Sequence, residues 1–194
     1  MTGRQLSLSG YLCELRGKIM TVNIKDILKS GDVTRFHSVP NMVGQKNSEH
    51  SWGVAVLCWY FKPDCSRNLI LKALTHDCAE LITGDTPATV KWSDPKIKEV
   101  LDAIEDKVEF EWGIGTFIIN DEEKELLKFC DMIEGMNYCL NQRECGNRAA
   151  EFPFSQWAEA ILKRFKGTLT HTQLTMYTNL MRAMESHQQY SGAL

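Results

Sequence analysis

The sequence lacks long hydrophobic runs and an excess of positive charge. Its longest apolar run starts at Val54 and stops before Lys62, far short of the roughly 20 residues that a membrane helix needs. With 22 Lys and Arg against 25 Asp and Glu, the chain offers no broad basic surface for polymeric nucleic acid. No basic segment followed by an apolar stretch opens it, which is unlike a secretory signal. We therefore expect neither a membrane nor a nucleic-acid partner.

Paired cysteines are also missing, although the chain has seven cysteines. None of them belongs to a Cys-x-x-Cys motif, and an odd number scattered through apolar stretches is typical of reduced thiols in a cytosolic protein. Zinc ribbons and disulfide frameworks are therefore poor explanations of these residues. We expect a cytoplasmic protein.

Repeats, low-complexity tracts and an obvious linker are absent as well, so 194 residues fit one compact domain. A content of 43% hydrophobic and 24% charged residues is ordinary for a globular protein and argues against disorder. Residues 1–19 show little hydrophobic periodicity, and the first well-patterned stretch begins at Met20. We divide the chain into a poorly patterned extension, residues 1–19, and one domain, residues 20–194.

Helix start and stop signals recur along this domain, whereas no alternating run is long enough to predict a strand. The signals include Asn and Ser residues suited to N-caps, glycines at helix ends, and Asp94 followed by Pro95. We expect helices over residues 23–31, 48–61, 66–84, 94–112 and 120–145, and two more that begin at Ser155 and Thr170. The prediction is an all-α bundle of about six to seven helices.

The expected helix over residues 66–84 carries three ionisable side chains within about one turn. His76, Asp77 and Glu80 are spaced so that they share one helix surface, and their neighbours are apolar. Buried His, Asp and Glu side chains are costly unless they are paired or bind a metal. This segment is therefore the strongest candidate for a functional site.

His50 and Asp131 lie in two other apolar helices and could join these residues. Two imidazoles and two carboxylates from three helices would form a mixed nitrogen and oxygen site suited to Mn, Fe, Co or Zn. Taken singly, His50 is explained as a core histidine bonded to the backbone, and Asp131 as a cap or salt-bridge partner. Only the joint pattern favours a metal site.

Other ionisable residues have simpler explanations. Glu49 is expected to support a helix start rather than to take part in chemistry. The basic cluster of Lys163, Arg164 and Lys166 is expected to be a solvated helix end.

The order His50, His76-Asp77, Asp131 resembles the signature of the HD-domain phosphohydrolases, an all-helical family in which such residues hold one metal ion. Further motifs, between residue 31 and about residue 140, resemble the 5′-deoxynucleotidase branch, which includes short phage dATP triphosphohydrolases. These motifs are Arg35-Phe36, Ser48-Glu49-His50-Ser51, His76-Asp77-Cys78-Ala79-Glu80, and Thr83-Gly84-Asp85-Thr86-Pro87 followed by Lys91. Phe36 departs from the Trp that the bacterial enzymes usually carry, although it keeps an aromatic ring for contact.

The resemblance implies metal-dependent hydrolysis of the 5′-phosphoester of a 2′-deoxynucleotide. One divalent ion (Mn, Co, Zn, Fe or Mg) would be held by His50, His76, Asp77 and Asp131. Glu80 would orient the attacking water or take its proton, and Asp85 would assist the leaving 5′-oxygen. The substrate would be contacted by Arg35 and Lys91 at phosphate and by Phe36 at the base or deoxyribose, while His37 either contacts phosphate or only packs.

Two substrates remain open, because the same residues would hydrolyse a deoxynucleoside monophosphate or release triphosphate from a deoxynucleoside triphosphate. Lys46 and His37 would suit a longer phosphate chain, although Lys46 is also explained as a solvated side chain. A binding module that has lost catalysis is disfavoured by the presence of Glu80 and Asp85. We further expect a homo-oligomer, a dimer or higher, in the cytoplasm of a bacterium or of a phage-infected cell.

Overall fold

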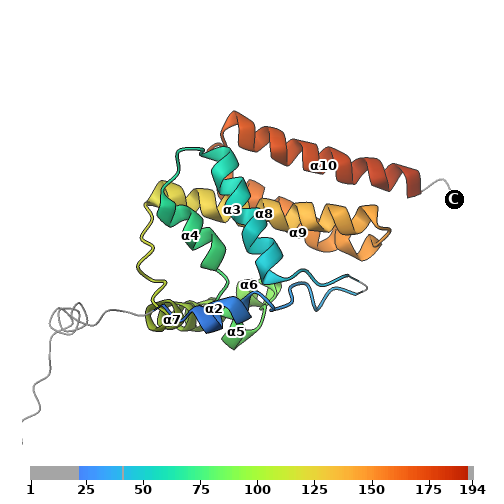
Figure 1. Ribbon diagram of the computed structural model, residues 1–194. Helices are drawn as coiled ribbons and strands as arrows, with labels where there is room; N and C mark the ends of the chain where they lie inside the picture. Colours follow the sequence, from blue (N-terminus) through green and yellow to red (C-terminus); the bar gives the residue numbers. More distant parts are fainter. Residues whose placement is uncertain (1–21, 41, 192–194) are drawn as a thin grey trace, which may run out of the picture.

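The computed structural model describes residues 22–40 and 42–191, and this part of the chain is helical with no strand (Figure 1). An isolated bridge pairs Thr34 with Lys46. In chain order the elements are α2 (Ile24–Ser30), α3 (Asn47–Phe61), α4 (Arg67–Thr75), α5 (Glu80–Thr83), α6 (Ala88–Ser93), α7 (Pro95–Glu111), α8 (Asp121–Glu144), the 3₁₀ turn η1 (Arg148–Ala150), α9 (Glu151–Phe165) and α10 (His171–Ser191). The prediction of an all-α bundle is confirmed. The expectation for residues 1–19 concerns a segment outside the described residues.

Side chains at the expected caps begin several helices. The side chains of Asn23, Ser66, Asp94 and Asn120 each accept a hydrogen bond from a backbone N–H of the following turn. Such bonds satisfy amides that have no partner inside the helix. α3 begins one residue earlier than expected, and Glu49 accepts from the backbone N–H of Lys46 at 3.0 Å. Glu49 therefore supports the helix start, as predicted.

The single helix expected over residues 66–84 is wrong, because α4 ends at Thr75 and α5 begins at Glu80. Nδ1 of His76 bonds to the carbonyl of Ala73 at 2.8 Å, the carbonyl that the amide of Asp77 would use in a continuous helix. The following amides bond only three residues back, as Glu80 does to Asp77 at 3.0 Å. Two further differences are the short helix α6, which the sequence did not predict, and the start of α9 at Glu151 rather than Ser155.

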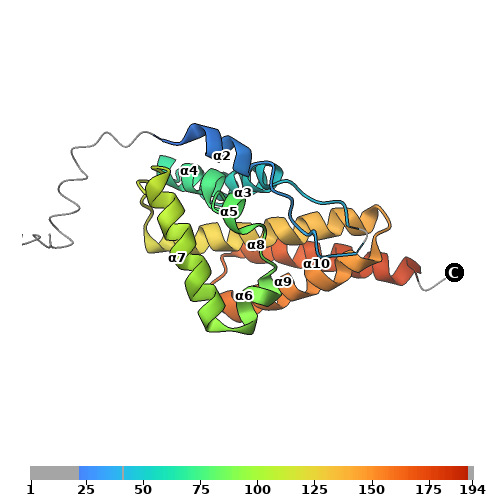
Figure 2. The same ribbon diagram turned by 90° about the horizontal axis from the view of Figure 1, so that it is seen from below.

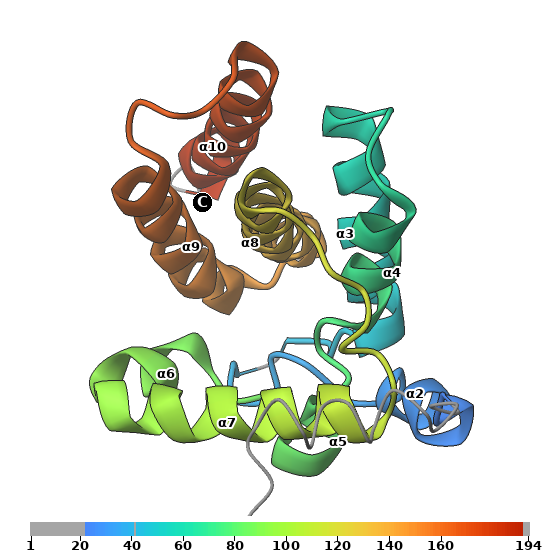
Figure 3. The ribbon, with the colours of Figure 1, turned by 90° about the vertical axis from the view of Figure 1, so that its left-hand side faces the viewer.

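Helix α8 lies in the middle of the bundle. Figure 3 shows it between α3 and α4 on one side and α9 and α10 on the other, with α6 and α7 below; it packs against α3, α4, α9 and α10. Figure 2 shows α7 running across the direction of α8. The core side chains Phe129, Ile133 and Met136 of α8 are fully buried. No helix among the described residues is long and apolar enough to span a membrane.

Removal of the Phe129 ring should destabilise the whole bundle. Phe129 makes edge-on contacts with Phe61 of α3 and Phe165 of α9, with ring centroids 5.5 Å apart in both pairs. A large cavity in this position should cost about 3–5 kcal/mol in Phe129→Ala, measured as the free energy of unfolding in urea. Phe152→Ala removes an exposed ring from α9 and should change the free energy of unfolding by less than about 0.5 kcal/mol. Equal effects of the two substitutions would contradict this description of the core.

Candidate metal centre and active-site cavity

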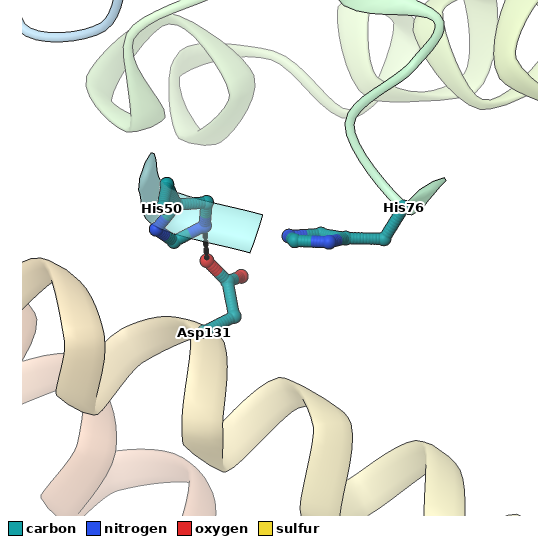
Figure 4. Close-up of side chains that lie close together, drawn as sticks. All are labelled: His50, His76 and Asp131. Carbon is teal, nitrogen blue, oxygen red and sulfur yellow. Dashed lines mark ion pairs between the residues drawn. The ribbon is translucent and has the colours of Figure 1, made fainter. Parts of the chain in front are cut away.

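His50 is fully buried on α3, and both of its ring nitrogens face carboxylates. Its Nδ1 contacts the carboxylate of Glu134. Its Nε2 lies 3.2 Å from Oδ1 of Asp131 and 3.6 Å from Oδ2 of Asp77, and Figure 4 shows the Asp131 carboxylate reaching up from α8 to the ring. The imidazole is therefore fixed on one edge by Glu134 and turned with the other edge toward the remaining site residues.

His76 occupies the turn that follows α4. Because its Nδ1 is held by the carbonyl of Ala73, its Nε2 points the other way, 3.4 Å from Oδ2 of Asp77. The His76 ring lies 5.2 Å from the His50 ring, centroid to centroid. The interruption of the helix thus brings the second imidazole next to the first.

One donor atom each from His50, His76 and Asp131 lies within 4.8 Å of the others. Among the described residues, Nε2 of either histidine has no partner in hydrogen-bond geometry, although buried polar atoms normally have one. Two such nitrogens beside a carboxylate are the donor set that a divalent cation uses. The residues therefore fit a metal ion, and Asp77 adjoins the same space. That these four residues bind metal stays a prediction.

The charges around this space favour ionised carboxylates. Burial by itself disfavours a charged imidazole, but Asp131 and Glu134 raise the pKa of His50 to about 9. Burial lowers the pKa of His76. Burial opposes ionisation of Asp131, yet Lys128 and His50 hold its pKa well below the usual value. The Asp131 carboxylate is thus ionised beside the two imidazoles, at the place where a cation would lie.

Arg35 is buried in the loop between α2 and α3. Its amide bonds to the carbonyl of Gln45 at 2.8 Å, which closes the loop against the start of α3. Nη1 of Arg35 donates to Oδ2 of Asp77 at 2.5 Å. Burial opposes ionisation of Asp77, but the neighbouring His76 and Arg35 charges lower its pKa. The guanidinium therefore stands next to the donor cluster, on the cavity wall.

Glu80, the first residue of α5, is buried beside the same cluster. Its Oε2 accepts from Nδ2 of Asn47 at 2.9 Å, and the same amide lies 3.3 Å from the carbonyl oxygen of Asp77. Burial, reinforced by the Asp77 charge, raises the pKa of Glu80 to about 8. Glu80 is therefore a carboxyl group that can hold a proton near neutral pH.

Asp85 follows Gly84, whose φ of 71° ends α5. Oδ2 of Asp85 accepts from the backbone N–H of Phe36 at 3.0 Å and lies 3.6 Å from Nδ1 of His37. Phe36 has a φ of 58°, in the left-handed region that costs a non-glycine residue free energy and is frequent at functional sites. Asp85 thus helps to hold a strained loop at the cavity.

Three other residues that the sequence predicted to contact substrate, Phe36, His37 and Lys46, lie outside the cavity lining in the described part of the chain. The Phe36 ring stacks on Tyr138, with centroids 5.4 Å apart and planes 16° apart, and among described residues neither Phe36 nor His37 lines the cavity. The Lys46 ammonium donates to Thr34 and to a loop carbonyl at 2.9 Å. Contacts of these residues with a substrate stay predictions.

A cavity of about 1170 Å³ opens beside the donor cluster. Its wall includes seven of the predicted site residues: Arg35, His76, Asp77, Glu80, Asp85, Lys91 and Asp131. Lys91 reaches it from α6, with Nζ 3.9 Å from the carboxylate of Glu105 on α7. Four further cations on α8 and α9 line it: Lys124, Lys128, Lys163 and Arg164. The last two, expected to be only a solvated helix end, are exposed and also border the cavity.

Sequence reasoning missed three polar residues: Glu134 and Asn47, which contact the predicted His50 and Glu80, and Gln45, which donates to Glu134. A signal existed for Glu134, because it follows Asp131 by three residues in α8 and therefore shares its helix face. Asn47 similarly precedes His50 by three residues at the start of α3. Gln45 lies in a loop, where no periodicity could point to it.

Comparison with known proteins identifies relatives. Residues 27–113 match the family model described as 5′-deoxynucleotidase YfbR-like. The chain is 32% identical over 126 residues to the dATP triphosphohydrolase of cyanophage S-2L, an alignment that covers 60% of this chain and 71% of that protein. It is 28% identical over 138 residues to the 5′-deoxynucleotidase YfbR of Shigella boydii serotype 18, covering 59% of this chain and 69% of the relative.

Solved structures share the fold. The cyanophage S-2L HD phosphohydrolase bound to dA and one catalytic Zn²⁺ ion superposes with a TM-score of 0.59 at 22% identity, covering 88% of this chain and 99% of the other. An HD-domain phosphohydrolase from Listeria innocua gives 0.57 at 18% identity, with 86% and 97% covered. By its sequence relatives, and with a fold that agrees, the chain belongs to the YfbR-like 5′-deoxynucleotidase family of HD-domain phosphohydrolases.

Proposed function

We propose that the protein hydrolyses the 5′-phosphoester of 2′-deoxynucleoside monophosphates, giving deoxynucleoside and phosphate, with one divalent metal ion. The observation that carries the proposal is the convergence of His50, His76 and Asp131 donor atoms beside a cavity that His76, Asp131 and Arg35 line. The names of the bacterial relatives and of the matching family support the substrate class.

His50, His76, Asp77 and Asp131 would hold the metal. A bound divalent ion would polarise a phosphoryl oxygen and lower the pKa of a water molecule. Zn²⁺ is favoured by the imidazole donors and by the catalytic Zn²⁺ ion of the cyanophage phosphohydrolase, with Mn, Co, Fe and Mg as the alternatives to test.

Arg35 would bind the phosphate that undergoes hydrolysis. Its guanidinium is fixed in position by Asp77, and its charge stands at the cavity wall beside the donor cluster. A fixed guanidinium can contact two phosphate oxygens in one plane. It would orient the phosphorus toward the metal and stabilise the charge that develops on the phosphoryl oxygens. Lys91 would add a second positive charge from α6.

Glu80 would act on the attacking water, and Asp85 would act on the leaving 5′-oxygen. With a pKa of about 8, Glu80 exchanges its proton near neutral pH, and its ionised form can accept a proton from the attacking water. Asn47 directs its carboxylate through the 2.9 Å hydrogen bond. Asp85, held by the Phe36 amide, would approach the leaving 5′-oxygen.

A second candidate is release of triphosphate from a deoxynucleoside triphosphate, as the name of the phage relative indicates for that protein. The observation that favours it is the basic end of the cavity. Along α8, Lys128 precedes Asp131 by about one turn and Lys124 by about two, roughly 4.5 and 10.5 Å at 1.5 Å per residue. Lys163 and Arg164 stand nearby on α9, since Arg164 pairs with Glu125 of α8 at 2.7 Å. A longer phosphate chain could extend along these cations, although Lys124, Lys128 and Arg164 also pair with carboxylates of α8.

A phosphate-release panel tests both candidates. Four deoxynucleoside monophosphates, four triphosphates and the ribose forms AMP and ATP would each be incubated with Mn, Co, Mg or Zn. The leading proposal predicts orthophosphate and nucleoside from monophosphates, and the second predicts inorganic triphosphate. A hydroxyl buried without a partner costs about 1–3 kcal/mol, so ribose forms should react roughly 5- to 150-fold more slowly. No hydrolysis of any deoxynucleotide under any metal would refute both.

His76→Ala should abolish metal-dependent turnover while leaving the fold intact. It removes one of the two unpartnered imidazole nitrogens from the donor cluster. Turnover with added metal, and metal content after dialysis, are the measurements. His171→Ala, at the exposed start of α10, is the matched control and should behave as the unchanged protein. Full activity of His76→Ala, or of the chelated protein, would exclude the assigned site.

Glu80→Gln should lower the turnover number by roughly 10²–10⁴-fold, the range for a general acid or base. The amide keeps the shape of the side chain but cannot take up the proton. Metal binding should be retained, because Glu80 is outside the donor cluster. Glu159→Gln alters another cavity carboxylate, on α9, and should keep most of the turnover. Turnover of Glu80→Gln within about threefold of the original, with metal bound, would remove Glu80 from the mechanism.

We also propose a cytoplasmic homo-oligomer. Trp52, Val56 and Trp59 form an exposed apolar stripe on α3, and the two indoles are 67% and 59% exposed. Such stripes are usual at interfaces. The six cysteines of the described residues are free thiols, as in a reducing compartment. Light scattering that gives a monomer mass at micromolar concentration would reject the oligomer.

A further inference from the structure

We propose that Glu134 is a positioning residue that holds His50 in the orientation and tautomer needed to bind a divalent metal through Nε2, and that Gln45 and Gly53 keep Glu134 in place. The inference rests on the proposed metal site but not on the identity of the substrate. It concerns residues of three different segments: α8, the loop before α3, and α3 itself.

The contacts form a chain that ends at the donor cluster. One carboxylate oxygen of Glu134, Oε2, contacts Nδ1 of His50, and the other, Oε1, accepts from Nε2 of Gln45 at 2.6 Å. All three side chains are buried. Water therefore contributes little to the orientation of the imidazole, and the carboxylate is its chief polar restraint on that edge.

The arrangement selects one form of the imidazole ring. A carboxylate can only accept a hydrogen bond, so Nδ1 of His50 must carry the proton. Nε2 faces Asp131 across 3.2 Å and is then the only ring nitrogen left for a metal ion, which would replace the second proton that the neighbouring carboxylate favours there. Histidines that bind metals are commonly held in this way by a carboxylate on the opposite nitrogen, which also makes the ligand nitrogen more basic.

Gly53 makes room for this carboxylate. It lies inside α3, where glycine weakens a helix relative to alanine. A Cβ at this position would lie 2.8 Å from Cγ of Glu134, too close for Glu134 to stay where it is. Cγ is in the middle of the side chain, so its displacement would move the carboxylate away from His50. The glycine thus serves the position of Glu134 rather than the stability of α3.

A purely structural role for Glu134 makes a different prediction. If the carboxylate only compensated a buried imidazolium, its loss would lower the stability of the metal-free protein and leave its metal affinity unchanged. A positioning role predicts instead that metal binding becomes weaker while the protein remains folded. Metal affinity measured without substrate separates the two.

The experiment titrates the full-length, metal-stripped protein with Mn²⁺ by calorimetry, and with Zn²⁺ by competition against a chelator. For Glu134→Gln we expect the dissociation constant to rise about 10- to 100-fold, as for other residues that support a metal ligand. Glu122→Gln removes an exposed carboxylate from the same helix and should bind as the original protein does. Turnover of Glu134→Gln should recover when metal is added to saturation.

Gly53→Ala provides a second variant, in which every polar group is retained. It should also weaken metal binding, because it displaces Glu134, while circular dichroism still reports a folded helical protein. Metal affinity within twofold of the original in whichever of the two variants folds would overturn the inference. If the original protein bound neither Mn²⁺ nor Zn²⁺, the proposed metal site itself would fail, and the inference with it.

Discussion

The burial of His50 among three carboxylates is the constraint on which the rest of the site depends. An imidazole without solvent needs a partner for each nitrogen, and here Glu134 serves Nδ1 while Nε2 faces Asp131 and Asp77. Three carboxylates at such short range repel one another unless positive charge lies between them. A divalent ion would supply that charge and use the unpartnered nitrogens of both histidines.

Helix α8 carries two of the three carboxylates and also the core of the bundle. Asp131 and Glu134 project from it toward His50, while Phe129, Ile133 and Met136 are fully buried in the core. The same helix therefore holds the bundle together and fixes two of the carboxylates. Because a packed interior resists displacement, the carboxylates are held at distances that side chains on a loop would not maintain.

The loop between α2 and α3 supplies Arg35, the arginine next to the donor cluster. It brings Arg35 to the cavity wall, and its strained residue Phe36 is bonded through its amide to Asp85. Phe36 has a positive φ, and its ring stacks on Tyr138. Arg35 and Asp85 are thereby connected through the backbone of Phe36, whose amide donates to the Asp85 carboxylate at 3.0 Å.

Local signals explain what could be predicted about the helices. The caps at Ser66, Asp94 and Asn120 were visible because a cap depends on residues within one turn. The break after Thr75 was not, since it arises when His76 bonds the carbonyl of Ala73, and the same residue types are compatible with a continuous helix. The short helix α6 has too few residues to display a period.

The sequence by itself determined the helical class and the identities of the candidate ligands, because apolar periodicity and the order of His and Asp residues are properties of the chain. Only the tertiary structure decided which groups support them. Glu134 contacts His50 from another helix and is itself held by Gln45 of a loop, and Lys163 of α9 borders the cavity. Helical spacing restricts neighbours along one helix, whereas contacts between helices follow from how whole faces pack.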